Sequence, residues 1–133
     1  MGTPNWANRT IFTGDNLYVM RGMNSESVDL IYADPPFNSN RNYSAPVGSK
    51  AAGAAFKDAW TLLDVDLMEH NRLREENKGL FAAIAAAKYT HSKGMFSYLV
   101  MMTLRLIEMR RILKPTGSIY LHCDPFASHY LKS

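Results

Sequence analysis

Ser-Val-Asp-Leu-Ile-Tyr-Ala-Asp-Pro-Pro-Phe, residues 27–37, is the segment most informative about the fold. Its first seven residues are almost continuously apolar, which is typical of a parallel strand covered on both faces. The strand must stop at Asp34, because the two prolines that follow cannot donate the hydrogen bonds of a ladder. The stretch therefore predicts a buried strand whose carboxyl end carries Asp34.

A second strand of this kind is predicted near the end of the sequence, after a long helix. The helix covers 96–113, where apolar residues recur at the three- and four-residue spacing of a buried helix face. These residues are Leu99, Met102, Leu106, Met109 and Leu113. Lys-Pro-Thr-Gly at 114–117 is a helix stop. Residues 118–123 then read as a buried strand that ends at Asp124.

Upstream of residue 27, the sequence predicts one more strand and one more helix. Residues 9–13 are a short β-prone run, followed by Gly14 and Asp15. Asp15 is a good N-cap for the helix. Apolar residues then recur at helical spacing, at Leu17, Met20 and Met23.

The middle of the chain separates the two buried strands. Residues 38–59 are rich in Asn, Ser, Gly and Ala and have no clear period, so we expect a long, mobile active-site loop. Aspartates at 64 and 66 cap a charged helix that runs to about Lys78. Gly79 is the predicted break, and 80–89 is predicted as an Ala-rich helix.

This order of elements predicts an α/β fold, a partial doubly wound (Rossmann-like) arrangement with about three mostly parallel strands. A length of 133 residues suits a single domain. Ligands of such sheets bind at the carboxyl ends of the strands, and Asp15, Asp34 and Asp124 each follow a predicted strand. Either these three carboxylates line one edge of the sheet, or each caps the helix or turn that follows it.

Composition and charge exclude several classes of protein. Hydrophobic residues make up 47% and charged residues 20%, as in folded proteins. No apolar run approaches the roughly 20 residues needed to span a bilayer, residues 1–10 lack a signal-peptide core, and Cys123 has no disulfide partner, so we expect a cytoplasmic protein. The net charge of +3 is compatible with a polyanionic partner. Four scattered histidines without paired cysteines predict no metal site.

Asp34 and its neighbours suit the methylation of an exocyclic amino group. Such an amine is a poor nucleophile, because its lone pair is delocalised into the ring. Hydrogen bonds accepted from its two N–H groups favour a tetrahedral nitrogen and free the lone pair. A carboxylate at Asp34 and the carbonyl of Pro35 are acceptors without a competing donor. Phe37 can stack on the planar base, which contributes about 1–3 kcal/mol in comparable sites.

Residues 32–38, Tyr-Ala-Asp-Pro-Pro-Phe-Asn, resemble the catalytic motif of amino-group DNA methyltransferases, which make N6-methyladenine or N4-methylcytosine. Gly14-Asp15, followed by 27–31, resembles the lead-in of the β class of this family. Residues 108–124 resemble the later helix-turn-strand segment of that class. The resemblance covers nearly the whole chain, with its segments in the order of the β class.

The resemblance implies a methyltransferase fold and S-adenosylmethionine as the methyl donor. It implies double-stranded DNA as the substrate, with the target base flipped out, because the amino group is otherwise paired and stacked. It assigns the catalytic roles to Asp34, Pro35, Pro36 and Phe37. It assigns cofactor binding to Asp15 and Asp34.

Contacts to the flipped base or to nearby phosphates are assigned to Phe37, Asn38, Arg41 and Tyr43. For Arg41, a solvated loop charge is the alternative. Adenine is favoured over cytosine as the target, because the motif begins with aspartate.

The Phe-x-Gly-x-Gly cofactor loop of the β class has no counterpart in these 133 residues, whose glycines are isolated. We expect either a truncated chain that stops inside a helix at 129–133, or a second chain that completes the enzyme. A homodimer is a further option. We expect the isolated chain to be inactive.

Two other functions remain open. The chain can be an inactive remnant, or one chain of a split enzyme, that binds DNA or a partner subunit. It can also methylate a protein glutamine or an RNA guanine. Families with those activities place their cofactor glycines before the motif, and no such loop precedes Asp34, which favours the DNA enzyme.

Overall fold

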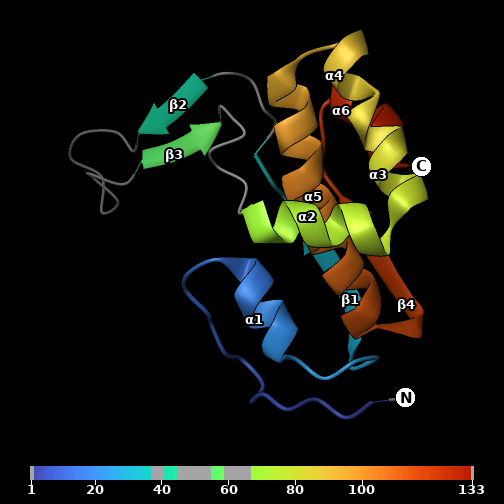
Figure 1. Ribbon diagram of the computed structural model, residues 1–133. Coiled ribbons are helices and arrows are strands. Elements are labelled where there is room, and N and C mark those ends of the chain that lie inside the picture. Colours follow the sequence, from blue (N-terminus) through green and yellow to red (C-terminus); the bar gives the residue numbers. More distant parts are fainter. Residues whose placement is uncertain (1, 37–40, 45–54, 59–66, 133) are drawn as a thin grey trace. The chain divides into compact units, whose positions relative to one another are not determined.

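The computed structural model describes residues 2–36, 41–44, 55–58 and 67–132 (Figure 1). The chain forms two compact units. The first, here called the sheet unit, comprises Met1–Asp34 and Met102–His122. The second, the helical unit, comprises Pro35–Met101 and Cys123–Ser133.

The sheet unit is built on two parallel strands, β1 (Val28–Ala33) and β4 (Leu113–Leu121). Helix α1 (Asn16–Gly22) precedes β1, and helix α5 (Lys93–Ile112) leads directly into β4. The predicted parallel pairing is confirmed. β1 ends immediately before Asp34, as the two prolines require.

β1 and β4 pair residue for residue only in their carboxyl-terminal parts, starting from Leu30 and Ser118. Val28 pairs with Leu113, so β4 advances five residues while β1 advances two. The Lys-Pro-Thr-Gly segment, predicted as a helix stop, therefore forms an irregular stretch within β4. At Gly117, a Cβ would lie 3.0 Å from the Asp29 carbonyl oxygen and 2.7 Å from Cδ1 of Leu113. Glycine permits this close approach of the two strands.

One face of the sheet packs against the core of the sheet unit. Met20 of α1 and Met109 and Ile112 of α5 are buried there. Partly buried side chains surround this cluster: Met23, Val28, Ile31, Ala33 and Leu106. The methionines that recur at helical spacing are thus core residues, which suits their flexible, apolar side chains.

The other face of the sheet presents apolar side chains to solvent. Leu30 and Tyr32 of β1 and Tyr120 of β4 are each more than half exposed. Side chains alternate between the two faces of a strand, and these three occupy alternate positions of the paired strands. The expectation that 27–33 is covered on both faces is therefore wrong for the described part of the chain. A continuous apolar run shows that a strand can be covered, but not what covers it.

Residues 9–13, predicted as a third strand, form none. Arg9 has a φ of 58° and Gly14 a φ of 123°, and Ile11 and Phe12 are exposed. A β-prone run becomes a strand only where a neighbouring strand pairs with it, and none of the described strands does so. The α/β class holds, but the parallel sheet has two strands instead of about three.

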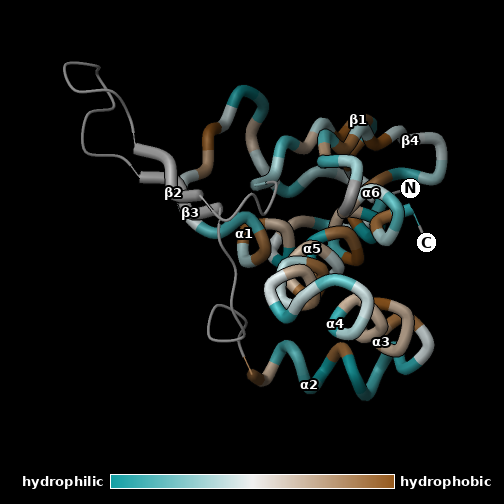
Figure 2. Tube along the Cα trace, turned by 90° about the horizontal axis from the view of Figure 1, so that it is seen from above, coloured by the Kyte–Doolittle hydropathy of each residue, from teal (hydrophilic) through white to brown (hydrophobic). Residues whose placement is uncertain are grey.

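The helical unit contains the first part of α5. It also contains the helices that precede α5 in the chain: α2 (Leu67–Glu76), α3 (Lys78–Ala85) and α4 (Ala87–Thr90). Helix α6 (Pro125–Leu131) also belongs to it. Figure 2 shows α2 as mainly hydrophilic and α3 as mainly apolar. The unit's buried side chains include Leu73, Ile84, Ala87, Phe96, Tyr98, Leu99, Val100 and Ala127.

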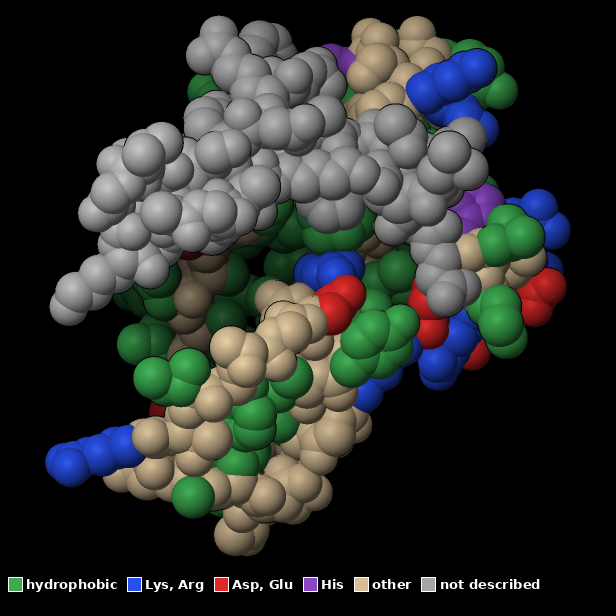
Figure 3. Space-filling view, turned by 90° about the vertical axis from the view of Figure 1, so that its left-hand side faces the viewer, with side chains coloured by type: hydrophobic (Ala, Val, Ile, Leu, Met, Phe, Trp, Pro, Cys, Tyr) green, Lys and Arg blue, Asp and Glu red, His purple; other side chains and the backbone are tan. Residues whose placement is uncertain are grey.

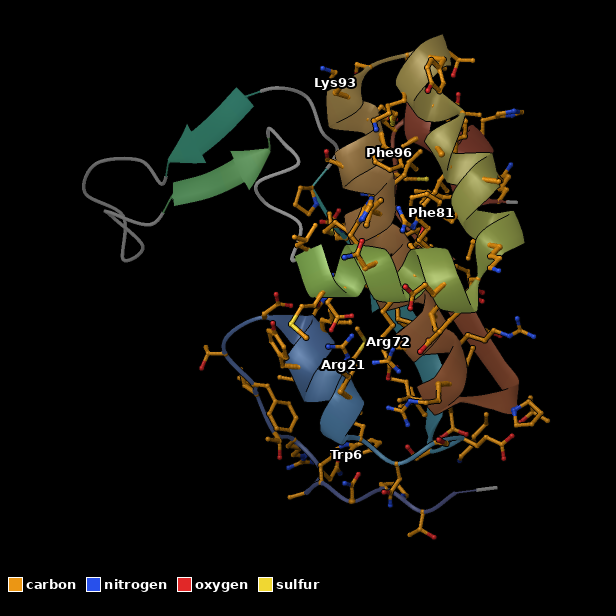
Figure 4. All side chains as sticks on the ribbon, in the orientation of Figure 1. Trp6, Arg21, Arg72, Phe81, Lys93 and Phe96 are labelled. Carbon is orange, nitrogen blue, oxygen red and sulfur yellow. The ribbon has the colours of Figure 1, made fainter. Side chains whose placement is uncertain are left out.

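Three rings join α2, α3 and α5 inside the helical unit. His70 meets Phe81 and Phe96 edge-to-face, at centroid distances of 5.2 and 5.9 Å. Phe81 and Phe96 are also edge-to-face, at 5.9 Å, and point toward each other in Figure 4. Such ring pairs fix the packing of the helices more specifically than aliphatic contacts do.

Two expectations about the middle of the chain need correction. The break between the helices falls at Asn77, with φ −133° and ψ 59°, and Gly79 lies inside α3. Asn77 makes no side-chain capping bond; its non-helical backbone separates the two helices, and its carbonyl oxygen accepts from the N–H of Phe81 at 2.8 Å. One glycine is tolerated within a helix. Within 38–59, where we expected a loop, β2 (Arg41–Ser44) and β3 (Ala55–Asp58) pair as antiparallel strands.

Candidate active site at the carboxyl ends of β1 and β4

Asp34 and His122 lie side by side at the edge of the sheet. Each follows the last residue of its strand, and the last residues, Ala33 and Leu121, are paired in register. The backbone N–H of His122 donates to the carbonyl oxygen of Ala33 at 2.9 Å. Nδ1 of His122 lies 3.0 Å from Oδ1 of Asp34. A carboxylate only accepts hydrogen bonds, so Nδ1 is the donor.

The Asp34 carboxylate faces solvent with one oxygen unused. The side chains of Asp34 and His122 are 65% and 58% exposed. Among the residues that the structure describes, Oδ2 of Asp34 has no hydrogen-bond partner. One carboxylate oxygen is therefore held by the protein, and the other is available to a ligand.

Pro36 belongs to the helical unit, where its carbonyl oxygen accepts a 2.6 Å hydrogen bond from the hydroxyl of Tyr98. Tyr98 lies on α5 and is fully buried. Since proline has no N–H and a fixed φ, this bond anchors a stiff backbone segment. Tyr98, the residue that fixes Pro36, was not identified from the sequence.

Asp15 is engaged within the sheet unit. Its Oδ1 accepts from the N–H of Leu17, so it caps α1. Nη2 of Arg105 lies 2.9 and 3.0 Å from the two carboxylate oxygens, and Nε of Arg105 donates to Asn16. Arg105 is only 16% exposed, and Asp15 is 42% exposed. The predicted capping role is confirmed, and any ligand of Asp15 shares the carboxylate with Arg105.

The remaining candidate residues belong to the helical unit or lie outside the described residues. Asp124 belongs to the helical unit and caps α6, accepting from the N–H of Ala127 at 2.6 Å. Arg41 and Tyr43 lie on β2, opposite Asp58 and Phe56. Phe37 and Asn38 lie outside the described residues.

Sequence reasoning missed His122 and Arg105. A signal for His122 was present, because two parallel strands that end at the same edge place the residues after them together. Arg105 had no comparable signal. It is one of several arginines on α5, and only the approach of α1 selects it.

Charged side chains of both signs are visible on one face of the molecule (Figure 3). On the face shown in Figure 3, acidic and basic side chains lie in small adjoining groups rather than in one large basic patch. No group of three or more His, Cys, Asp or Glu side chains that could hold a metal ion occurs among the described residues. No helix among the described residues is long and apolar enough to cross a membrane.

Comparison with known proteins identifies the family. No solved structure matches the chain. Over 116 residues the chain is 31% identical to the Mod subunit of the type III restriction-modification enzyme StyLTI from Salmonella typhimurium. The match covers 84% of this chain and about 15% of that subunit. The family model described as DNA methylase matches residues 28–133, which include β1, Asp34 and β4, and the chain therefore belongs to the DNA methylase family.

Proposed function

We propose that this chain carries the catalytic carboxylate of an S-adenosylmethionine-dependent DNA methyltransferase that acts on the exocyclic amino group of adenine. The observation that carries the proposal is the exposed Asp34 at the carboxyl end of a parallel strand, with Oδ2 open to a ligand. Ligands of such sheets bind at this edge. Membership of the DNA methylase family supports the reaction class.

In this proposal, Asp34 acts by accepting a hydrogen bond from the target amine. S-adenosylmethionine supplies a methyl group on a positively charged sulfur. As the target nitrogen takes up the methyl group that S-adenosylmethionine would supply, the nitrogen becomes tetrahedral and its N–H groups become stronger donors. Oδ2 of Asp34 then holds an N–H more strongly than in the ground state, which lowers the barrier. The nitrogen loses one proton, for which Asp34 is a ready acceptor.

The other site residues contribute position and capture of the base. We assign stacking on the flipped base to Phe37 and the second acceptor to the carbonyl of Pro35. The bond from Tyr98 holds the carbonyl of Pro36, which follows Pro35 in the chain. Rigid placement matters, because a misplacement of order 1 Å can cost about 100-fold in rate. Asn38, Arg41 and Tyr43 are assigned to the base or nearby phosphates.

In this proposal, polypeptide beyond these residues contributes to the cofactor pocket. Asp15 and Asp34 are the carboxylates assigned to the cofactor, but the sequence contains no Phe-x-Gly-x-Gly loop. The chain spans about 15% of the Mod subunit that it matches. We propose that a complementing segment or chain completes the pocket and the recognition of double-stranded DNA, in a cytoplasmic enzyme.

The test is Asp34→Ala in the assembled methyltransferase, measured as single-turnover transfer of labelled methyl groups. We expect methyl transfer to be abolished while DNA affinity at fixed salt is nearly unchanged, since DNA affinity comes mainly from phosphate contacts. Asp29→Asn is the matched control. It alters an exposed carboxylate of β1 that pairs with Lys114, and it should leave the rate unchanged.

A rate for Asp34→Ala above about a tenth of the original, a loss under roughly 1.4 kcal/mol, contradicts the proposal. Asp34 would then not be the central acceptor. Incubation with adenine- and cytosine-containing duplexes identifies the methylated base, and N4-methylcytosine as the product would refute the adenine assignment alone.

A further inference from the structure

We propose that His122 is a positioning residue for Asp34. Its Nδ1–H holds Oδ1 of the carboxylate and turns Oδ2 toward the amino group. The inference rests on the proposed function of Asp34, and extends it to a residue of the neighbouring strand.

The backbone places the imidazole at a fixed point. Ala33 and Leu121 are paired in the ladder, and the N–H of His122 donates to the Ala33 carbonyl at 2.9 Å. This bond joins the two strands one residue from Asp34. The side-chain contact between Nδ1 and Oδ1, at 3.0 Å, is therefore made between two residues whose backbones are already joined.

The carboxylate needs such a partner. The terminal torsion of an aspartate side chain has broad minima, so a carboxylate at the surface can rotate over a wide range. Asp34 is 65% exposed, and the contact with His122 is its one hydrogen bond within the described part of the chain. Without that bond, Oδ2 has no preferred direction.

Stability alone does not account for the pair. Both partners are more than half exposed, and exposed pairs of this kind contribute little to stability. The pair occurs where β1 ends at the proposed catalytic carboxylate, and its geometry leaves one oxygen open. Orientation of the carboxylate is the role that fits both observations.

Amide side chains at position 122 distinguish a hydrogen bond to Asp34 from a role that needs only the volume of the imidazole ring. His122→Asn places an amide nitrogen near the position of Nδ1, whereas His122→Gln places it near the position of Nε2. We expect His122→Asn to keep at least a third of the single-turnover rate. We expect His122→Gln and His122→Phe to lose about 10-fold or more, with unchanged DNA affinity. The melting temperature of each variant should stay within a few degrees of the original.

A spectroscopic measurement tests the contact independently of catalysis. Nitrogen-15 NMR of the 133-residue chain should show neutral His122 as the Nδ1–H tautomer. Asp34→Ala should shift it toward the Nε2–H tautomer. An unchanged tautomer in Asp34→Ala overturns the inference.

The activity measurements separate the two proposals. If Asp34→Ala is inactive while His122→Gln has the original rate, or if Asn and Gln at 122 lower the rate equally, the positioning role is refuted and the proposed function stands. If Asp34→Ala remains active, the proposed function fails, and the positioning role in catalysis fails with it.

Discussion

At the residue scale, the same residue type serves different purposes after different elements. Asp34 has one open oxygen at the sheet edge, whereas Asp15 caps α1 and binds Arg105. Asp124 caps α6. The neighbour decides each role. A helix that starts directly after an aspartate offers N–H groups to it, and two prolines after Asp34 offer none.

Asp15 should therefore contribute measurably to the stability of the chain. Asp15→Ala removes the cap and the ion pair, and we expect the free energy of unfolding to fall by about 1–2 kcal/mol. Asp15→Asn keeps an oxygen that can cap α1 but weakens the pair with Arg105, so its loss should be smaller. Urea denaturation measures both values.

A double-mutant cycle with Arg105→Gln isolates the ion pair. A loss for Asp15→Asn as large as that for Asp15→Ala would show that the cap contributes little. No loss for either variant would contradict the structural role of Asp15.

At the element scale, β4 differs from a regular strand because the Lys-Pro-Thr-Gly segment is accommodated within it. Between the pairs Val28–Leu113 and Leu30–Ser118, β4 has more residues than β1. Gly117 is the point at which this segment returns to the ladder, close to the Asp29 carbonyl. A side chain at that position would force the strands apart.

Two glycine-to-alanine substitutions should have opposite effects on stability. Gly117→Ala places a methyl group 3.0 Å from a backbone oxygen and closer still to Leu113, so we expect the free energy of unfolding to fall by about 1–3 kcal/mol.

Gly79→Ala lies within α3, where an added Cβ meets nothing within 4 Å. It should raise the free energy of unfolding by about 0.4–1 kcal/mol. Thermal and urea denaturation test both, and stabilisation by Gly117→Ala would show that the irregular stretch of β4 adapts freely.

At the scale of the whole molecule, the sheet unit leaves much apolar surface exposed. Leu30, Tyr32 and Tyr120 are open on one face of the sheet, whereas parallel sheets are normally covered on both faces. The sequence also contains no glycine-rich cofactor loop. Both observations fit the proposal that a further segment or chain completes the active enzyme.

The 133-residue chain should consequently bind S-adenosylmethionine very weakly. Isothermal calorimetry should show a Kd above about 1 mM, equivalent to less than about 4 kcal/mol of binding free energy. Methyl transfer by the isolated chain should be undetectable. Micromolar affinity would mean that these residues already form the pocket, and that the assignment of its missing part is wrong.

Features that depend on neighbouring residues could be predicted from the sequence. The prolines after Asp34 fix the end of β1, the periodic apolar residues predict α5, and Asp15 and Asp124 cap the helices that start after them. Each of these depends on local backbone chemistry, so a single stretch of sequence suffices. Family membership follows in the same way, from motifs in a fixed order.

Contacts between distant residues became known from the folded chain alone. The register of β1 and β4 brings His122 to Asp34, 88 positions apart in the sequence, and the approach of α1 to α5 selects Arg105 as the partner of Asp15. The tertiary structure also decided that residues 9–13 form no strand, since none of the described strands pairs with them. Pairing and register depend on the packing of whole elements, and the local sequence of one partner contains no record of the other.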